Sequence, residues 1–149
     1  MSTIRSLLCA VDFSKPSEHA LRHAIALAEA LGAELHVVHV YTVPVYALPD
    51  GALVAGPQWT ARIMSDAEQQ MKALLERVET GSVKVTPHVL EGVPHEEIPA
   101  LARKLGVDLL VAGTHGRTGL AHLLLGSVAE RIVRTADRPV LTVRPPAEP

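Results

Sequence analysis

Five short segments rich in valine and leucine, separated by segments with helical spacing, constrain what this chain can fold into. Four are almost continuously apolar and one alternates between apolar and polar residues; they cover 7–11, 35–40, 83–90, 109–112 and 140–143. Near-continuous apolar runs of this length are typical of strands that are covered on both faces. We therefore expect a sheet with helices on both sides.

Four helical patterns lie between these predicted strands. The first follows Ser14 and ends at Gly32, and the second covers about 59–79. The third covers about 95–105, and the fourth begins near Ser127. Strands and helices that alternate in this way indicate an α/β fold whose parallel strands are joined by right-handed helical crossovers.

Two stretches fit no regular element. Residues 41–57 contain three prolines and two glycines, so we expect a mobile loop there. Thr114–Leu125 is a long insertion before the fourth helix, and long structured loops in compact domains are often functional. The 149 residues correspond to a single domain over 1–149, in which we expect the proline-rich end, 145–149, to be disordered.

Charge and cysteine content exclude several classes of partner. Fourteen basic and sixteen acidic residues leave a net charge of −2, which argues against a general nucleic-acid or membrane-surface binder. Cys9 is the only cysteine, so no internal disulfide can form and a reducing compartment is expected. The apolar run at 7–11 is too short for a signal peptide or a membrane span. We therefore expect a cytoplasmic protein without nucleic-acid or membrane partners.

A glycine-rich segment follows the fourth predicted strand. Gly113, Gly116, Gly126 and Ser127 form the pattern Gly-x2-Gly-x9-Gly-Ser, which ends where the fourth helix begins. Glycine lets a phosphate approach several backbone N–H groups at once, and a helix N-terminus favours an anion. Arg117 adds a cation within the loop. This arrangement predicts a phosphate-binding loop.

Of three other interpretations of this segment, one remains open and two are excluded by its spacing. Ser127 and Glu130 fit a capping box, Ser-x-x-Glu, which requires no ligand. The segment is no Walker A loop, because Gly-Lys-Ser/Thr does not follow a four-residue gap. Nor does Gly-x-Gly-x-x-Gly follow the first strand, so we do not expect dinucleotide redox chemistry.

Residues at the ends of the first and second predicted strands could complete a nucleotide site. Asp12 could accept hydrogen bonds from ribose hydroxyls, or it could cap a turn. The second strand ends at Val40 and Tyr41, where backbone groups could face the edge of an adenine. In open α/β sheets, ligands bind beyond the carboxyl ends of the strands.

Histidines and nucleophiles offer little evidence of metal binding or catalysis. His19 and His23 lie one helical turn apart without a third ligand nearby, which is typical of a polar helix face. His36 and His39 should point to opposite faces of a strand. His115 lies inside the glycine-rich loop, where it could contact phosphate or order the loop. We assign no metal ligand and no catalytic residue.

The chain resembles the universal stress protein family over nearly its whole length. The matching segments are 8–14, 35–40, 111–116, 125–130 and 138–143. The complete Gly-x2-Gly-x9-Gly-Ser pattern is similar to that of the nucleotide-binding branch of the family. The resemblance implies a doubly wound, Rossmann-like five-stranded parallel sheet in the order 3-2-1-4-5, related to the adenine nucleotide alpha hydrolases.

The resemblance also implies roles for individual residues. Ala10 and Val40 would touch the base, and Asp12 would meet the ribose or adenine. The remaining residues would follow the ribose and phosphates of ATP, with Mg²⁺ accompanying the phosphates: Ala112, Gly113, Thr114, His115, Gly116, Arg117, Gly126, Ser127 and Val128. A homodimer would form through the edge strand Val140–Val143.

The favoured hypothesis is a small ATP-binding regulatory protein of the stress response. Nucleotide would order Thr114–Leu125 and change a surface that an unknown protein partner recognises. One alternative is a slow ATPase or AMP-forming enzyme, for which His115 is the one base we can name. The other is a dimeric interaction module that binds AMP, a cyclic nucleotide or no nucleotide.

Overall fold

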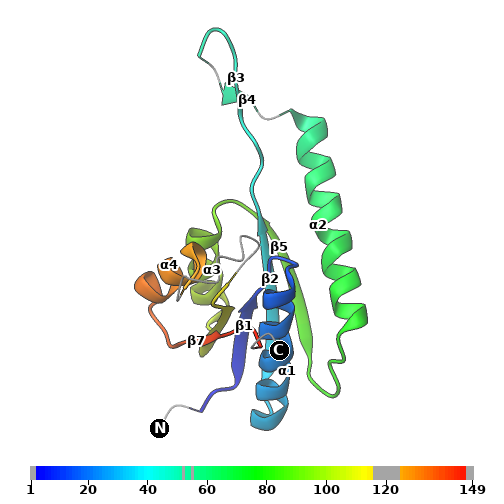
Figure 1. Ribbon diagram of the computed structural model, residues 1–149, viewed down its shortest axis with the longest axis vertical. Coiled ribbons are helices and arrows are strands. Elements are labelled where there is room, and N and C mark those ends of the chain that lie inside the picture. Colours follow the sequence, from blue (N-terminus) through cyan, green and yellow to red (C-terminus); the bar gives the residue numbers. More distant parts are fainter. Residues whose placement is uncertain (1–2, 52, 55, 116–124, 147–149) are drawn as a thin grey trace.

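The computed structural model describes residues 3–51, 53–54, 56–115 and 125–146, and a five-stranded parallel sheet forms its centre (Figure 1). Its strands lie in the order β5-β2-β1-β6-β7, which is 3-2-1-4-5 when they are numbered along the chain. Both the α/β class and the strand order are thereby confirmed. The strands are β1 Ser6–Ala10, β2 Glu34–Tyr41, β5 Val85–Glu91, β6 Leu109–Gly113 and β7 Val140–Val143.

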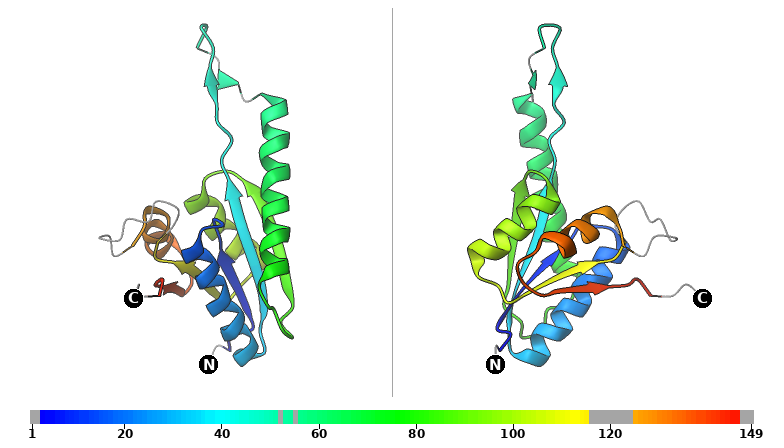
Figure 2. Two further views of the ribbon diagram at one scale, coloured as in Figure 1. Left: turned by 45° about the vertical axis from the view of Figure 1, so that its right-hand side comes forward. Right: turned by 90° about the vertical axis from the view of Figure 1, so that its left-hand side faces the viewer.

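Helices cover both faces of this sheet (Figure 2). Helices α1 (Lys15–Leu31) and α2 (Pro57–Arg77) share one apolar cluster with the strands. Helices α3 (Pro94–Leu105) and α4 (Ser127–Thr135) cover the opposite face. None of the described helices combines the length and the apolar character that crossing a bilayer requires.

The side chains of β1 explain why its sequence is apolar without interruption. Leu7 and Cys9 point into the cluster formed with α1 and α2, whereas Leu8 points into the cluster formed with α3 and α4. Successive strand residues face opposite sides of a sheet, so a strand with helices on both sides has no face for polar residues. Burial raises the pKa of the Cys9 thiol to about 12, which keeps it protonated and unreactive.

Strand β5, whose sequence alternates, lies at an edge of the sheet. Pro87 stands opposite Val37 of β2 and has no N–H to donate to a further strand. An edge position tolerates this missing donor. The proline therefore fits the end of the sheet that carries β5.

The starts predicted for α1 and α4, after Ser14 and near Ser127, are both confirmed, but the cap of α4 is not a capping box. Ser14 is the N-cap of α1 and its side chain accepts from the Ser17 amide, while Gly32 ends the helix with φ +64°. In α4 the N-cap is Gly126, and Ser127 is already the first helical residue. The capping-box alternative is therefore wrong, and Glu130 instead pairs with Arg134 one turn later.

The segment between β2 and α2 is more regular than the loop we expected. Strands β3 (Tyr46–Ala47) and β4 (Leu53–Val54) pair antiparallel in a short hairpin that projects from the body (Figure 1). Helix α2 also begins at Pro57, two residues earlier than predicted. At the C-terminus, residues 145 and 146 belong to no helix or strand, and 147–149 lie outside the described residues.

Candidate functional site

A cavity of about 260 Å³ opens at the carboxyl edge of the sheet. The ends of β1, β2 and β6 form its floor, and residues from the first turns of α1, α3 and α4 line it. The chain leaves β1 toward β2 on one side, while β6 flanks β1 on the other, so the cavity lies at the switch point of the sheet. This is the position at which doubly wound sheets bind ligands.

One wall of the cavity is apolar. Ala10, Val40 and Ala112 contribute from the strands, and Ile98 and Ile132 contribute from α3 and α4. Such a wall suits a flat aromatic ring, because it excludes water without providing competing hydrogen-bond donors. Backbone groups at the nearby strand ends could form hydrogen bonds that orient such a ring.

The N-terminus of α4 also lines the cavity. Gly126, Ser127, Val128 and Ala129 line it, and no side chain caps the helix there. The first N–H groups of a helix have no partner within the helix and carry its positive dipole end. The described lining residues include no lysine or arginine. An anion in this part of the cavity would therefore be held by backbone amides.

The end of β6 is fixed by backbone and side-chain hydrogen bonds. The Thr114 amide donates to the carbonyl of Val143, and the Gly126 amide donates to the carbonyl of Thr114. The hydroxyl of Thr114 lies 2.8 Å from Nδ1 of His115. These contacts hold the two ends of the 115–125 segment together beside the cavity.

Gly113 of β6 packs beside the first turn of α1. A Cβ at this position would lie 3.4 Å from the carbonyl oxygens of Pro16 and His115. That distance is an ordinary contact, so a Cβ would fill the remaining space against α1. The glycine therefore contributes to packing behind the cavity as well as to its lining.

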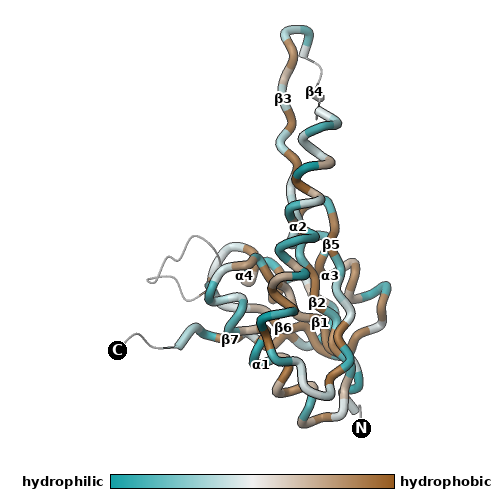
Figure 3. The backbone as a smooth tube through the Cα atoms, turned by 90° about the vertical axis from the view of Figure 1, so that its right-hand side faces the viewer, coloured by the Kyte–Doolittle hydropathy of each residue, from teal (hydrophilic) through white to brown (hydrophobic). Residues whose placement is uncertain are grey.

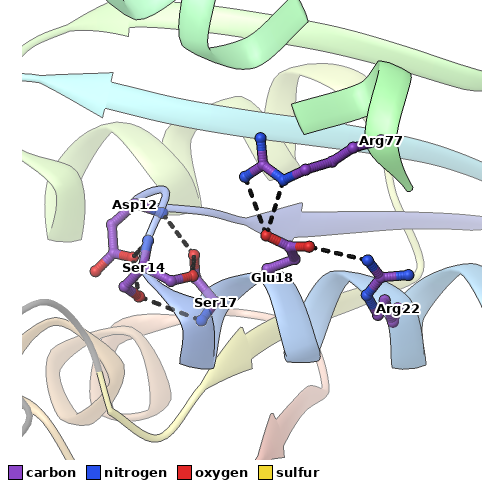
Figure 4. Close-up of polar contacts among 6 residues, drawn as sticks. All are labelled: Asp12, Ser14, Ser17, Glu18, Arg22 and Arg77. Atoms are coloured by element: carbon purple, nitrogen blue, oxygen red, sulfur yellow. Dashed lines mark hydrogen bonds and ion pairs between the residues drawn. The ribbon is translucent and has the colours of Figure 1, made fainter. Parts of the chain in front are cut away.

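Asp12 joins the cavity to the start of α1 (Figure 4). Its Oδ1 accepts hydrogen bonds from the Ser14 amide, at 3.0 Å, and from the Ser14 hydroxyl. The Asp12 amide donates to Oγ of Ser17 at 3.1 Å. The turn-capping role that the sequence left open is thus present, in a residue that also lines the cavity.

His39 and Phe13 fix the backbone on which Asp12 lies. Phe13 has φ +66°, a left-handed conformation that is uncommon outside glycine. His39, only 8% exposed, places Nδ1 2.8 Å from the carbonyl oxygen of Val11 and packs its ring 4.2 Å from that of Phe13. This contact holds both sides of Asp12 in place. The predicted opposite orientation of His36 is confirmed, since His36 contacts His88 instead.

Ten of the twelve residues predicted for the site line this one cavity, whereas Gly116 and Arg117 lie outside the described residues. Their individual contacts with a ligand stay predictions. The ten are Ala10, Asp12, Val40, Ala112, Gly113, Thr114, His115, Gly126, Ser127 and Val128. The prediction missed seven lining residues. One is His39, and the sequence marked the others only as apolar or helical: Val11, Ser17, Pro94, Ile98, Ala129 and Ile132.

Within the described part of the chain, no group of three histidine, cysteine or acidic side chains could hold a metal ion. His19 and His23 meet edge to face, with ring centroids 4.6 Å apart, on the surface of α1. This pair therefore has no third ligand of those types among the described residues.

Comparison with known proteins identifies the family. The family model described as "Universal stress protein family" matches residues 3–144. The chain belongs to the universal stress protein family. Universal stress protein MJ0531 of Methanocaldococcus jannaschii is 36% identical over 145 residues, covering 95% of this chain and 83% of the relative.

Solved universal stress proteins share the fold over almost the entire chain. The structure of MJ0577 has a TM-score of 0.80 at 26% identity and covers 99% of this chain and 100% of that one. As a sequence, universal stress protein MJ0577, also from Methanocaldococcus jannaschii, is 30% identical over 155 residues, with 94% of each chain covered. A universal stress protein solved in complex with cAMP has a TM-score of 0.62 at 26% identity, covering 96% and 98%.

Proposed function

We propose that this universal stress protein binds an adenine nucleotide, ATP foremost, in the cavity beside β1 and β6 and acts as a regulatory protein of the stress response. The observation that carries the proposal is the N-terminus of α4, which no side chain caps and which lines the same cavity as the apolar wall. A nucleotide combines a flat base with an anionic tail, and this cavity offers a surface for each.

The cavity supports one orientation of the nucleotide. The base would lie against Ala10 and Val40, and the ribose hydroxyls would donate to Asp12. The phosphates would then reach the amides at Ser127 and Val128. A universal stress protein of 26% identity that was crystallised with cAMP supports an adenine nucleotide as the class of ligand.

Mg²⁺ fits this cavity as a companion of the phosphates. Of the described lining residues, only Asp12 carries a carboxylate. Mg²⁺ commonly uses one or two carboxylates together with substrate phosphates. Asp12 and the phosphate oxygens would hold the ion, which would neutralise part of the phosphate charge.

The described polar side chains of the cavity favour binding over turnover. Oδ1 of Asp12 accepts from Ser14, Nδ1 of His39 lies on a carbonyl oxygen, and Nδ1 of His115 lies on the Thr114 hydroxyl. Each of these atoms serves the architecture of the cavity. We therefore propose that occupancy by nucleotide, rather than its hydrolysis, is the signal that a protein partner recognises. We keep the cytoplasm as the proposed compartment, since Cys9 is buried and forms no disulfide.

We also propose the homodimer through β7. This strand lies at the edge of the sheet, and Leu141 on it is exposed. An open strand edge with an exposed apolar side chain can pair with a second copy around a two-fold axis.

Calorimetric titration tests the proposed ligand. In titrations without Mg²⁺ we expect ATP to bind the wild type, and Asp12→Asn to weaken adenosine and ATP by a similar factor, on the order of tenfold, because about 1.4 kcal/mol of ribose contact is lost from both. Adenine, which lacks the ribose, should bind both proteins equally and serves as the control. ATP that binds Asp12→Asn as tightly as the wild type would remove Asp12 from the site.

A further inference from the structure

A protruding segment lies outside the proposed nucleotide site. We define the arm as residues 44–59, which contain the β3–β4 hairpin and the first residues of α2. Figures 1 and 2 show the hairpin standing clear of the sheet and its helices in every view. Each residue from 44 to 51 is exposed. Among the described residues, the body of the protein therefore leaves this part of the arm uncovered.

Apolar and hydrophilic residues alternate along the described part of the arm, whose sequence is almost uncharged (Figure 3). Asp50 is the single charged residue among its sixteen positions. Ten large hydrophobic side chains are exposed in the described part of the chain, and the arm carries four of them: Val45, Tyr46, Leu48 and Trp59. The arm thus concentrates exposed apolar surface that elsewhere is scattered.

The amount of this surface approaches that of an interface. Tyr46 and Trp59 are each just over half exposed, and an aromatic side chain buries roughly 150–250 Å² when it is covered. With Val45, Leu48 and the exposed prolines, one arm offers on the order of 500 Å² of apolar surface, within the range where patches are often functional. Two such arms would bury about 1,000 Å², the area at which stable interfaces begin.

The hairpin also lacks the support that a β-ribbon needs. Each of its strands has two residues, paired as Tyr46 with Val54 and Ala47 with Leu53. An isolated two-stranded hairpin is marginal in water, and at least three strands or a packing surface are needed for stability. A further strand or an apolar surface placed against the arm would supply this support.

From these observations we infer that the arm is an interface between two copies of this chain. In a two-fold contact each patch meets its own copy, so a charged patch would repel itself. A patch with one charge in sixteen residues avoids that repulsion. Hairpins that meet around a two-fold axis would join their free edges and bury Tyr46 and Trp59 together.

This contact is separate from the dimer proposed through β7. The hairpin extends from the end of the sheet near β2 and α2, whereas β7 is the edge strand on the side opposite β5 (Figure 1). A protein that uses both contacts would form tetramers or longer assemblies. A protein that uses only the arm would form dimers, whether or not it binds nucleotide.

Trp59 allows the inference to be tested in the unmodified protein. It is the only tryptophan of the chain and is 55% exposed. We expect its fluorescence emission to shift to shorter wavelength as protein concentration rises, in parallel with the mass measured by analytical ultracentrifugation. A shift at constant mass would mean that the arm folds onto its own chain and would overturn the inference. So would an emission spectrum that stays unchanged in the largest assembly.

Matched substitutions separate the two contacts. Leu48→Glu introduces a charge on the arm, and Leu31→Glu introduces the same charge at the end of α1; both leucines are 44% exposed. We expect Leu48→Glu to lose the concentration-dependent step of mass and emission, and Leu31→Glu to retain it. Each variant is first checked for an unchanged circular dichroism spectrum and melting temperature.

The background Leu141→Glu, which removes the β7 contact, isolates the arm. In this background the protein should still form dimers, and adding Leu48→Glu should leave monomers. A Leu141→Glu protein that is already monomeric at high concentration would overturn the inference, while the proposal of a β7 dimer in the wild type would stand. Binding of the wild type to phosphatidylcholine vesicles without any change of mass in solution would assign the arm to a lipid surface and would also overturn it.

Discussion

At the scale of single residues, Ser127 distinguishes a binding role of the α4 N-terminus from a structural one. It occupies the first position of the helix, after the N-cap Gly126, and it lines the cavity. A carboxylate at this position would stabilise the helix through its dipole by about 0.3–1 kcal/mol. The same carboxylate would repel phosphates. The two roles therefore respond to this substitution with opposite signs.

We predict that Ser127→Asp keeps or raises the melting temperature and weakens ATP binding by at least about tenfold, or roughly 1.4 kcal/mol. Isothermal titration and thermal unfolding measured on the same preparation check both effects. Ser127→Asn is the matched control, because it has the same shape without the charge. Equal ATP affinity for the Asp and Asn variants would show that the phosphates lie elsewhere.

Some residues of the site could be predicted and others could not, for a physical reason. Asp12, Val40 and Gly113 were predictable because they follow apolar runs, and the carboxyl ends of parallel strands meet at one edge. The support that His39 gives to Phe13 was not predictable, since it depends on how β1 and β2 pair. Nor could the local Ser-x-x-Glu pattern show that the helix begins at Ser127, one residue earlier than a capping box with Ser127 as N-cap requires.

At the scale of elements, β2 and β5 carry a histidine pair that links stability to pH. Nδ1 of His36 lies 2.9 Å from Nε2 of His88, so one ring nitrogen must donate and the other accept. Burial, and then His36 and Lys104, lower the pKa of His88 below its ordinary value of 6.5. The charged groups that accompany the pair are Glu34, Lys84 and Lys104.

The direction of the pH effect follows from this lowered pKa. As the pH falls below 6.5, His88 in the unfolded chain binds a proton before His88 in the folded chain does. Protonation therefore favours unfolding, and the contribution of His88 to stability decreases. We predict that His88→Gln reduces the fall in melting temperature between about pH 7 and pH 5.

Thermal unfolding across this pH range checks the prediction. His19→Gln, on the surface of α1, is the control and should follow the wild type. If the melting temperatures of wild type and His88→Gln fall in parallel, the pair does not contribute to the pH dependence of folding.

The elements themselves were largely predictable from periodicity. Continuous apolar runs correctly predicted β1, β2, β6 and β7, and the first three of these strands are buried on both faces. The hairpin at β3 and β4 was missed, since prolines and glycines mark turns without showing that short strands pair between them. Its strands of two residues are too short for any periodicity to be visible.

At the scale of the whole molecule, the β7 contact is one of the two contacts through which we propose that copies of this chain associate. Leu141 is exposed on this edge strand, so a glutamate there should leave the monomer fold intact. We predict that Leu141→Glu loses the β7 dimer. Light scattering in a Leu48→Glu background, which removes the arm contact, measures this loss. Leu31→Glu, at the end of α1 and outside both proposed contacts, should retain the dimer. A Leu141→Glu dimer that persists when Leu48→Glu is added would exclude β7 as the interface.

The same fold places three helix starts and three strand ends around one cavity, and the account rests on what the α4 amides hold there. A crystal structure of the protein grown with ATP and Mg²⁺ tests this most directly. We predict phosphate oxygens within hydrogen-bond distance, about 2.7–3.2 Å, of the amide nitrogens of Ser127 and Val128, with the base against Val40. Phosphates bound away from α4, or a cavity that stays empty at saturating ATP, would contradict the account.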